Sequence, residues 1–397
     1  MGLSWSWIHI AMLLYEVATT AFLLFNLTGA YLYKPIPDQG YRPSVSVIVP
    51  VYNEEQGIAR TIDAIFSSNY PKNKFELFVV DDKSTDDSLT VIKQKQLEHG
   101  FKVVEHDVNT GKRHATASGL KKCSGEIVVC IDSDAEISPD TITNLVQPFI
   151  NKEVYAVCGN AMVSNEYSPE ANSIIARFQK VWYAGAFRIR KASESLLGMV
   201  TCCSGVLSAY RREKIEAVLN AWLEETFFGR RCVTGDDRQM TNFMLQLGGK
   251  TVYQSNAMVY TIAPPTLQQF IKQQTRWGRS SVCGFLFAAK LFLHRKWNQK
   301  LVFYTTLFIT FATPLALIAS LTSLIWLGSF EVVTVYIAWL MLVSVVFALT
   351  TKILVDYFTR EDFVYRTFFF VMMLALSFVY LYAYVTSYKG GTKWMTR

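Results

Sequence analysis

Acidic side chains occur in three short groups along the chain, each beside a run of residues that could form a strand or a helix. The groups are Asp81-Asp82, Asp132-Ser133-Asp134 and Gly235-Asp236-Asp237, and Gln273-Gln274-Thr275-Arg276-Trp277 follows them. Paired carboxylates can hold a divalent cation through oxygen ligands or take a proton from a substrate hydroxyl. Taken singly, such groups are most often solvated turns or helix caps. Their occurrence together and in this order favours a catalytic site.

Apolar, β-branched runs alternate with amphipathic stretches in the part of the chain that carries these groups. The predicted strands include residues 46–49, 77–80, 103–104 and 127–131, and the predicted helices include 56–67 and 88–97. This alternation predicts an α/β fold, with a mostly parallel sheet that is covered by helices and binds ligands beyond the carboxyl ends of its strands. Asp81 and Asp132 follow two of the predicted strands. We therefore expect the two acidic groups to meet at adjacent strand ends in one crevice.

Composition and charge place part of the chain in a membrane. Of 397 residues 51% are hydrophobic and 14% are aromatic, which is high for a soluble enzyme. The net charge of +7 is spread along the chain without dense basic runs, which excludes a nucleic-acid binder and favours loops at an anionic membrane surface. Seven cysteines without paired metal-ligand spacing are typical of a reducing cytosol, so we expect neither zinc nor disulfides.

Apolar segments predict the membrane topology. Residues 7–32 form a retained anchor, and the absence of Lys or Arg before it puts the amino terminus outside and the following domain in the cytosol. Residues 301–327 and 332–354 are long enough to span, and the loop 328–331 between them, which lacks basic residues, faces outside. Basic residues after 388 favour the cytosol. The last apolar segment is therefore expected to be re-entrant, interfacial or a broken hairpin.

These segments give five predicted parts of the chain. They are a transmembrane anchor (1–34), a cytosolic catalytic domain (43–262), amphipathic interface helices with the Gln-Arg-Trp motif (263–298), transmembrane or re-entrant helices (299–388) and a cytosolic terminal segment (389–397).

Several motifs together resemble those of processive family-2 glycosyltransferases, and among these they are most similar to hyaluronan synthases. The similar segments are 47–54 (VIVPVYNE), 79–82 (VVDD), 111–115 (GKRHA), 132–134 (DSD), 235–238 (GDDR), 273–277 (QQTRW) and 394–397 (WMTR). The last is similar to the Trp-Gly-Thr-Arg gating segment of that family. The resemblance implies a cytosolic GT-A-type, Rossmann-like domain with an α-helical membrane region and interface helices.

The resemblance implies a nucleotide-sugar site at the strand ends. A UDP-sugar is anionic, so a carboxylate site accepts it through a divalent cation, Mg²⁺ or Mn²⁺. Asp134 is the implied metal ligand, with help from Asp132. Asp81 and Asp82 are expected to contact the base or ribose, and Lys112 the base or phosphate.

Roles in transfer are implied for the remaining motifs. Asp237 would be the general base, supported by Asp236, a role that suits a carboxylate if a partly buried site raises its pKa towards neutrality. Arg276 would stabilise the leaving diphosphate, and Trp277 would stack on the acceptor sugar. Further contacts to the substrate or growing polymer are implied for Gln273, Cys203, Trp394, Thr396 and Arg397.

The implied product is hyaluronan, made from UDP-GlcNAc and UDP-GlcA and extruded through the enzyme's own spans in the plasma membrane, without an obligate protein partner. The alternative is an N-acetylglucosamine homopolymer made from UDP-GlcNAc alone, as in nodulation-type chitin-oligosaccharide synthases, which commonly have one amino-terminal span. The segments 235–238 and 250–255 favour hyaluronan. A non-transferring sugar-binding partner of a secretion complex would not need Asp237, Asp134 and Arg276.

Overall fold

The computed structural model describes residues 2–164, 173–227, 229–231, 235–328, 330–355 and 359–387. The chain forms two compact units. The first comprises Met1–Tyr33, Asn172–Ser193 and Pro265–Ser387, and the second comprises Lys34–Ala171, Glu194–Pro264 and Tyr388–Arg397. Long apolar helices make up the first unit, and a β-sheet with its covering helices makes up the second.

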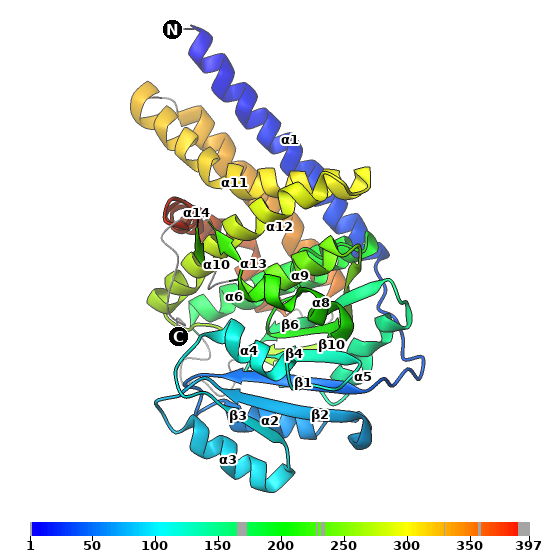
Figure 1. Ribbon diagram of the computed structural model, residues 1–397. Helices are drawn as coiled ribbons and strands as arrows, with labels where there is room; N and C mark the ends of the chain where they lie inside the picture. The colour runs from blue at the N-terminus through cyan, green and yellow to red at the C-terminus, as the bar shows by residue number, and fades with distance from the viewer. Residues whose placement is uncertain are drawn as a thin grey trace. The chain divides into compact units, whose positions relative to one another are not determined.

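The second unit contains an eight-stranded sheet with the strand order β3-β2-β1-β4-β7-β6-β10-β5 (Figure 1). The pairs β2·β3, β1·β2, β1·β4 and β6·β10 are parallel, whereas β7 and β5 run antiparallel to their neighbours. The predicted α/β fold with a mostly parallel sheet is confirmed. The strands are β1 (Val45–Val51), β2 (Phe75–Asp81), β3 (Lys102–Glu105), β4 (Ile127–Ile131), β5 (Ala135–Ile137), β6 (Val154–Val163), β7 (Leu207–Arg211) and β10 (Lys250–Thr261), and a separate hairpin pairs β8 (Thr226–Phe227) with β9 (Arg230–Arg231).

Helices cover this sheet, and they are short enough to fit between successive strands. They are α2 (Ile58–Phe66), α3 (Ser88–His99), α4 (Lys112–Leu120), α5 (Thr141–Val146), α8 (Arg212–Leu223) and α9 (Asp236–Gln246), with the 3₁₀ turns η1 (Lys72–Lys74) and η2 (Gln147–Ile150). The helix α4 packs closely on β1, because an added Cβ at Gly119 would lie 2.7 Å from Ile48 Cγ2. Every residue of β1 is buried, as its largely apolar sequence predicts for a central parallel strand.

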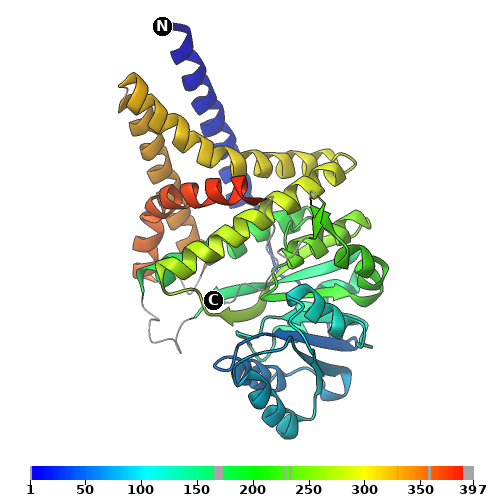
Figure 2. The ribbon, with the colours of Figure 1, turned by 60° about the vertical axis from the view of Figure 1, so that its left-hand side comes forward.

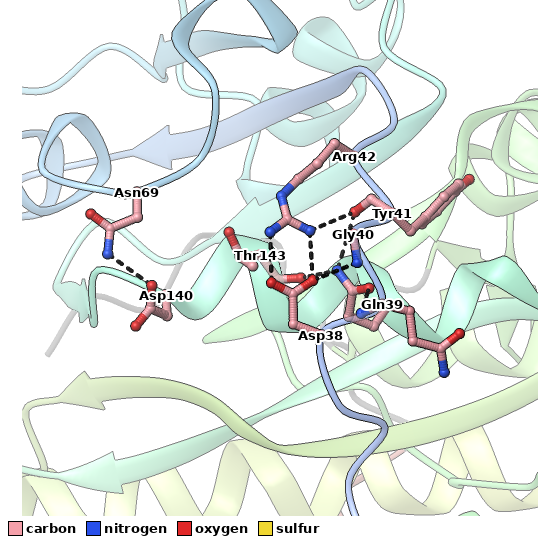
Figure 3. A network of polar contacts seen from close by, with 9 residues as sticks. Asp38, Gln39, Gly40, Tyr41, Arg42, Asn69, Asp140 and Thr143 are labelled. Carbon is pink, nitrogen blue, oxygen red and sulfur yellow. Dashed lines mark hydrogen bonds and ion pairs between the residues drawn. The ribbon is translucent and has the colours of Figure 1, made fainter.

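Buried amide side chains bind the segment that precedes β1 to the sheet unit, and within the segment Arg42 pairs with Asp38 over 2.7 Å (Figure 3). Gln147 accepts a hydrogen bond from the Gln39 amide over 3.0 Å and donates to the Tyr41 main-chain oxygen over 3.1 Å. Gln254 likewise accepts a hydrogen bond from the Ile36 amide over 3.2 Å and donates one to the Ile36 main-chain oxygen over 2.6 Å. Both glutamines have no exposed surface. The segment 34–44 is therefore part of the sheet unit, whereas the predicted catalytic domain begins at 43.

The first unit consists of α1 (Gly2–Leu32), α6 (Ile174–Ala184), the π-helix η3 (Gly185–Lys191), α10 (Leu267–Phe292), α11 (Trp297–Leu327), α12 (Phe330–Leu354), α13 (Arg360–Thr367) and α14 (Phe369–Val385). Along the chain, α7 (Ala192–Leu196) passes from this unit to the other. Among the described residues, three helices are long and apolar enough to cross a membrane, at His9–Leu32, Trp297–Ile325 and Phe330–Leu354. They coincide with the three simple spans that the sequence predicts.

The last apolar segment is bent. The helices α13 and α14 meet at an angle of 49°, which is compatible with one broken span or with a re-entrant pair. The predicted topology of this segment stays a prediction, and residues 389–397 lie outside the described part of the chain. The helices α6 and η3 fall within the stretch 43–262 that the sequence assigns to one domain, yet they belong to the helical unit.

The helices α10 and α14 pack side by side in the first unit (Figure 2, yellow-green and red). The Tyr380 hydroxyl donates to Gln274 Oε1 over 3.0 Å, and a Cβ at Gly278 would lie 2.7 Å from the Ala383 Cβ. Gln274, Gly278 and Arg279 of α10 meet Tyr380, Ala383 and Thr386 at the end of α14 in that order. The two helices therefore run in the same direction. The face of α10 that packs against α14 therefore starts at the motif 273–277.

Proline interrupts the hydrogen bonding of α11 without ending the helix. Pro314 cannot donate to the main-chain oxygen of Thr310, four residues earlier. The Tyr384 hydroxyl of α14 donates to that oxygen over 3.2 Å. Inside a bilayer such a freed carbonyl needs a partner from the protein. One tyrosine therefore completes the hydrogen bonding of α11.

Candidate active site

The first two acidic groups lie at the carboxyl edge of the parallel strands. Asp81 ends β2, and Asp132 follows β4 directly. The expectation of adjacent strands is wrong in detail, because β1 lies between β2 and β4. The three strands are parallel, so their carboxyl ends still share one edge of the sheet.

Asp81 presents a buried acceptor that has no partner among the described residues. Its side chain is 2% exposed. Oδ2 accepts a hydrogen bond from the Ser84 amide over 3.2 Å, whereas Oδ1 is buried and without a hydrogen-bond partner. An unpaired buried carboxylate oxygen is costly, so such atoms are rare in folded proteins. Oδ1 of Asp81 is suited to accept a hydrogen bond from a ligand.

Asp82 has a different environment, because protein donors already use its oxygens. It accepts from the Thr110 amide over 2.9 Å, from the Gly111 amide over 2.7 Å and from His106 Nδ1 over 2.7 Å. Gly111 has a φ of +89°, which a residue with a side chain rarely adopts. The carboxylate of Asp82 thus holds the turn that leads into α4. Contact with a nucleotide stays a prediction for this residue.

Lys112, the first residue of α4, forms an ion pair with Asp132. Burial disfavours the charged ammonium, but the charges of Asp132 and Asp237 outweigh burial and raise the pKa of Lys112. A Cβ at Gly205 would lie 3.2 Å from Lys112 Nζ and 3.5 Å from Asp132 Oδ1. Gly205 thus leaves room beside the ion pair.

The carboxylates of Asp132 and Asp134 could hold a divalent cation. Asp132 already binds a cationic group, that of Lys112, which shows that its position favours positive charge. Asp134 accepts a hydrogen bond from Thr261 Oγ1 over 3.3 Å. Carboxylate oxygens are ligands that Mg²⁺ and Mn²⁺ prefer. Two carboxylates fit a cation whose remaining ligands come from a substrate.

A second acidic group lies elsewhere in this unit. Among the described residues, Asp63 of α2 and Glu98 and His99 of α3 bring three potential ligand atoms within 4.8 Å of one another. The Lys95 ammonium lies 2.9 Å from Asp63 and 2.8 Å from Glu98, so a cation of the protein already balances this group.

Asp237 lies in the first turn of α9, where protein donors surround its carboxylate. Oδ2 accepts from the Gly205 amide over 3.0 Å, and Oδ1 accepts from the Arg238 amide over 2.8 Å. Burial by itself would raise the pKa of Asp237, but the Lys112 and Arg238 charges and these amides outweigh burial and lower the pKa below its usual value. The site therefore lowers the pKa of Asp237 instead of raising it towards neutrality, chiefly because of the nearby Lys112 ammonium.

Asp236, the neighbouring carboxylate, points to a different partner. Its Oδ1 accepts a hydrogen bond from Arg113 Nε over 2.7 Å, and its main-chain oxygen accepts one from Trp222 Nε1 over 3.1 Å. A direct role of Asp236 in transfer stays a prediction.

Cys203 has no exposed surface, and its amide donates to Thr241 Oγ1 over 2.8 Å. The thiol that faces the carboxylate of Asp237 belongs to Cys202, with 3.6 Å between Sγ and Oδ2. Cys202 thus lies beside Asp237, and the contact predicted between Cys203 and the acceptor stays a prediction.

The motif 273–277 lies on α10 in the helical unit. Gln273 Oε1 accepts from Gln274 Nε2 over 3.2 Å. The Trp277 ring lies edge-on to Trp182, with 5.8 Å between ring centroids, and tilted to Tyr183 at 6.3 Å. Arg276 is half-buried. The predicted roles of Gln273, Arg276 and Trp277 stay predictions, and Trp394, Thr396 and Arg397 lie outside the described residues.

The motifs do not predict the contacts of several residues around these carboxylates. His106 and Thr110 hold Asp82, Cys202 and Gly205 border Asp237, and Arg113 binds Asp236. Arg113 lies within the segment 111–115, and the other four are marked in the sequence only by lying within a few residues of a motif or of Cys203.

Comparison with known proteins points to one family. The model of that family, glycosyl transferase family 2, matches residues 46–219. A hyaluronan synthase of Streptococcus pyogenes is 32% identical over 274 residues, which are 67% of this chain and 64% of that protein. The chain thus spans less than two thirds of the length of that relative. An N-acetylglucosaminyltransferase of Sinorhizobium fredii is 30% identical over 293 residues, which are 71% of this chain and 69% of that protein.

A solved structure shares the fold. The mannosyltransferase PcManGT of Pyrobaculum calidifontis, in complex with GDP-Man and Mn²⁺, has a TM-score of 0.66 and 24% sequence identity, with 96% of this chain and 98% of that chain covered.

Proposed function

We propose that this chain, which belongs to glycosyl transferase family 2 as its motifs predict, is a processive, inverting glycosyltransferase that polymerises UDP-sugars. The observation that carries the proposal is the grouping of Asp81, the Lys112–Asp132 ion pair and Asp237 in one unit. An unpaired acceptor, a cation and an ionised carboxylate are what donor binding and acceptor deprotonation require.

Donor binding is assigned to the strand ends. The free Oδ1 of Asp81 would accept a hydrogen bond from the uracil ring. Lys112 would exchange Asp132 for a phosphate oxygen of the UDP. Asp132 and Asp134 would hold Mg²⁺ or Mn²⁺, which when bound supplies positive charge to the diphosphate. Asp82 would contribute by holding the turn before Lys112.

Transfer is assigned to Asp237. Because its pKa is lowered, the carboxylate is ionised at neutral pH and can accept the proton of the acceptor hydroxyl. The acceptor oxygen then attacks the anomeric carbon on the face opposite the nucleotide, which breaks the bond to the diphosphate and inverts the configuration. Arg276 would stabilise the charge on the departing UDP, and Trp277 would stack on the acceptor sugar.

Hyaluronan is the proposed product, with UDP-GlcNAc and UDP-GlcA as donors. The similarity to a hyaluronan synthase over 67% of the chain supports it. The second candidate is an N-acetylglucosamine homopolymer. The observation in its favour is that the N-acetylglucosaminyltransferase relative aligns over more of both chains.

Export of the product is proposed from the helical unit. The three helices of the described residues that are long and apolar enough to span support a multi-pass protein of the plasma membrane, with the sheet unit in the cytosol. The growing polysaccharide would leave between these helices, past Gln273, Trp277 and the terminal residues Trp394, Thr396 and Arg397.

Purified protein in liposomes tests the proposal, with UDP release and polymer measured for UDP-GlcNAc alone, UDP-GlcA alone and both together. Polymer only with both donors supports hyaluronan, and polymer with UDP-GlcNAc alone supports the homopolymer. Absence of polymer under all three conditions contradicts the proposed function. EDTA should abolish turnover, and added Mn²⁺ or Mg²⁺ should restore it.

Two substitutions test the assigned base and metal ligands. Asp237→Asn should lower turnover by about a hundredfold or more, because the proton acceptor is lost. Asp134→Asn should weaken binding of Mn²⁺ together with UDP, measured by calorimetry. Asp63→Asn is the matched control, because it changes a carboxylate of the other acidic group and should leave both measurements unchanged.

A further inference from the structure

Arg113 is a buried cation in the first turn of α4, one residue after Lys112. Its side chain is 4% exposed and lies over the Trp222 ring, with 5.3 Å between the guanidinium carbon and the ring centroid. Nε donates to Asp236 Oδ1 over 2.7 Å, and Nη1 donates to the Trp222 main-chain oxygen over 2.8 Å and to Glu225 Oε2 over 3.2 Å. One side chain thus contacts the last turn of α8 and the first residue of α9.

The same turn of α4 is anchored a second time, to the end of β2. The Asp82 carboxylate accepts hydrogen bonds from the amides of Thr110 and Gly111, immediately before the helix begins. Lys112 lies between this anchor and Arg113. Consequently Arg113 joins the helix that carries Lys112 to the helix that carries Asp237.

The geometry points to Arg113 as a positioning residue for glycosyl transfer. By holding Asp236, it fixes the first turn of α9 relative to Lys112, so that the carboxylate of Asp237 faces the donor. This inference rests on the proposed function. A guanidinium suits the task because its donors lie in one rigid plane, whereas a lysine ammonium is a point charge on a flexible stem.

Packing alone does not explain why an arginine occupies this buried position. A buried charge is costly, and an apolar residue of similar volume stabilises a core at least as well. Arg113 instead makes directed hydrogen bonds to two carboxylates and one main-chain oxygen. Charge-assisted hydrogen bonds of this kind specify the relative position of the groups that they join.

The test is Arg113→Lys, which keeps the positive charge and removes the planar set of donors. We expect kcat to fall about tenfold or more, because small misplacements of reacting groups carry large rate costs. The dissociation constant of UDP, measured by calorimetry with Mn²⁺, should change less than about threefold, since Asp81 and Lys112 are unaltered. Wild-type kcat in the folded variant, or loss of UDP affinity in parallel with kcat, would overturn the inference.

Arg211→Lys is the matched control. Arg211 is 8% exposed, lies over the Phe149 ring at 5.4 Å and donates to the main-chain oxygens of Val154 and Asn151 over 2.9 and 3.1 Å. It is thus a buried, aromatic-stacked arginine of the same unit whose hydrogen bonds go to Phe149, Asn151 and Val154 and not to α9. The substitution Arg211→Lys should lower the melting temperature and leave kcat within about twofold of the wild type. An equal loss of kcat in both variants would mean that burial, and not position, explains the effect.

Asp236→Asn supplies a second measurement that does not depend on the folding of Arg113→Lys, and a double-mutant cycle extends it where both variants fold. If Arg113 acts through Asp236, Asp236→Asn should reproduce the loss of kcat, and the double variant should lose little more. Additive losses would show two independent roles and contradict the inference. Turnover by the wild-type protein measures the proposed function, whereas ratios between variants measure the role of Arg113, so the two can fail separately.

Discussion

Glu76 joins several strands at the amino ends of the sheet, opposite the candidate active site. Its Oε1 accepts from Ser46 Oγ over 2.6 Å and from the Ser124 amide over 2.7 Å, and its Oε2 lies 2.7 Å from Lys102 Nζ. These partners belong to β1, to the turn before β4 and to β3. Burial by itself would raise the pKa of Glu76, but the hydrogen bonds outweigh burial and lower the pKa to about 2.

Glu76→Gln should therefore destabilise the protein in a pH-dependent way. A carboxylate with a lowered pKa stabilises the fold above its unfolded pKa, and this contribution is lost as the pH falls through the folded pKa. We expect a loss of about 2 kcal/mol at pH 7 that shrinks between pH 4.5 and about pH 2. Denaturant unfolding of the detergent-solubilised protein across this range measures it. Glu213→Gln, an exposed carboxylate of the same unit, should show little change; a pH-independent loss at position 76 would contradict the assigned pKa.

At the residue scale, the motifs located the candidate site but not the partners of its side chains. The sequence predicted that Asp81, Asp132 and Asp237 belong to one domain, because strand ends and a helix start can be recognised locally. It did not predict that Lys112 pairs with Asp132 or that Lys112 lowers the pKa of Asp237. These contacts join residues that are far apart in the chain, so only the folded sheet brings them together.

At the scale of elements, Gly278 allows α10 and α14 to pack closely. Glycine within a helix costs about 1 kcal/mol relative to alanine, so its presence in the middle of α10 needs a reason. The reason is the 2.7 Å approach of an added Cβ to Ala383. Small residues at helix contacts are typical of membrane proteins, where they let two helices pack closely.

Gly278→Val should force the two helices apart and destabilise the protein by about 2 kcal/mol, as overpacking does elsewhere. The melting temperature in detergent should fall by several degrees. Ser280→Val, on the same helix at a half-exposed position, introduces the same β-branched side chain and should have a small effect. Equal melting temperatures for Gly278→Val and the wild type would show that the helices are not in contact at this point.

The sequence predicted where most helices and strands lie, but not which of them pair or pack with one another. β1 to β4, α2 and α3 follow from apolar runs and helical periodicity, and their observed bounds differ from the predicted ones by a few residues. The order of the strands could not be predicted, since β7 returns antiparallel between β4 and β6 after a long excursion of the chain. Nor did periodicity show that α6 belongs with the apolar helices, because its own sequence is amphipathic.

At the scale of the whole molecule, the distribution of basic residues predicts an orientation in the membrane. The loop between α11 and α12 lacks Lys and Arg, whereas Lys296 and Lys300 flank the start of α11. The positive-inside rule puts the start of α11 in the cytosol and the start of α12 outside.

Cysteine labelling with an impermeant reagent measures this orientation. Glu331→Cys, in the exposed first turn of α12, should be modified in intact cells, and Asn298→Cys should be modified only after permeabilisation. The wild-type protein, with its seven cysteines, gives the background. The reverse pattern would place the sheet unit outside the cell, where UDP-sugars are absent, and would contradict the proposed function.

The hydroxyl of Tyr384 donates to a main-chain oxygen that lacks its usual helical donor because residue 314 is a proline. The two positions are therefore expected to vary together during evolution. A descendant with an ordinary amino acid at 314 would recover the missing amide hydrogen, and selection would no longer require a phenol at 384. Conversely, phenylalanine at 384 should be tolerated more readily once Pro314 has been replaced by alanine.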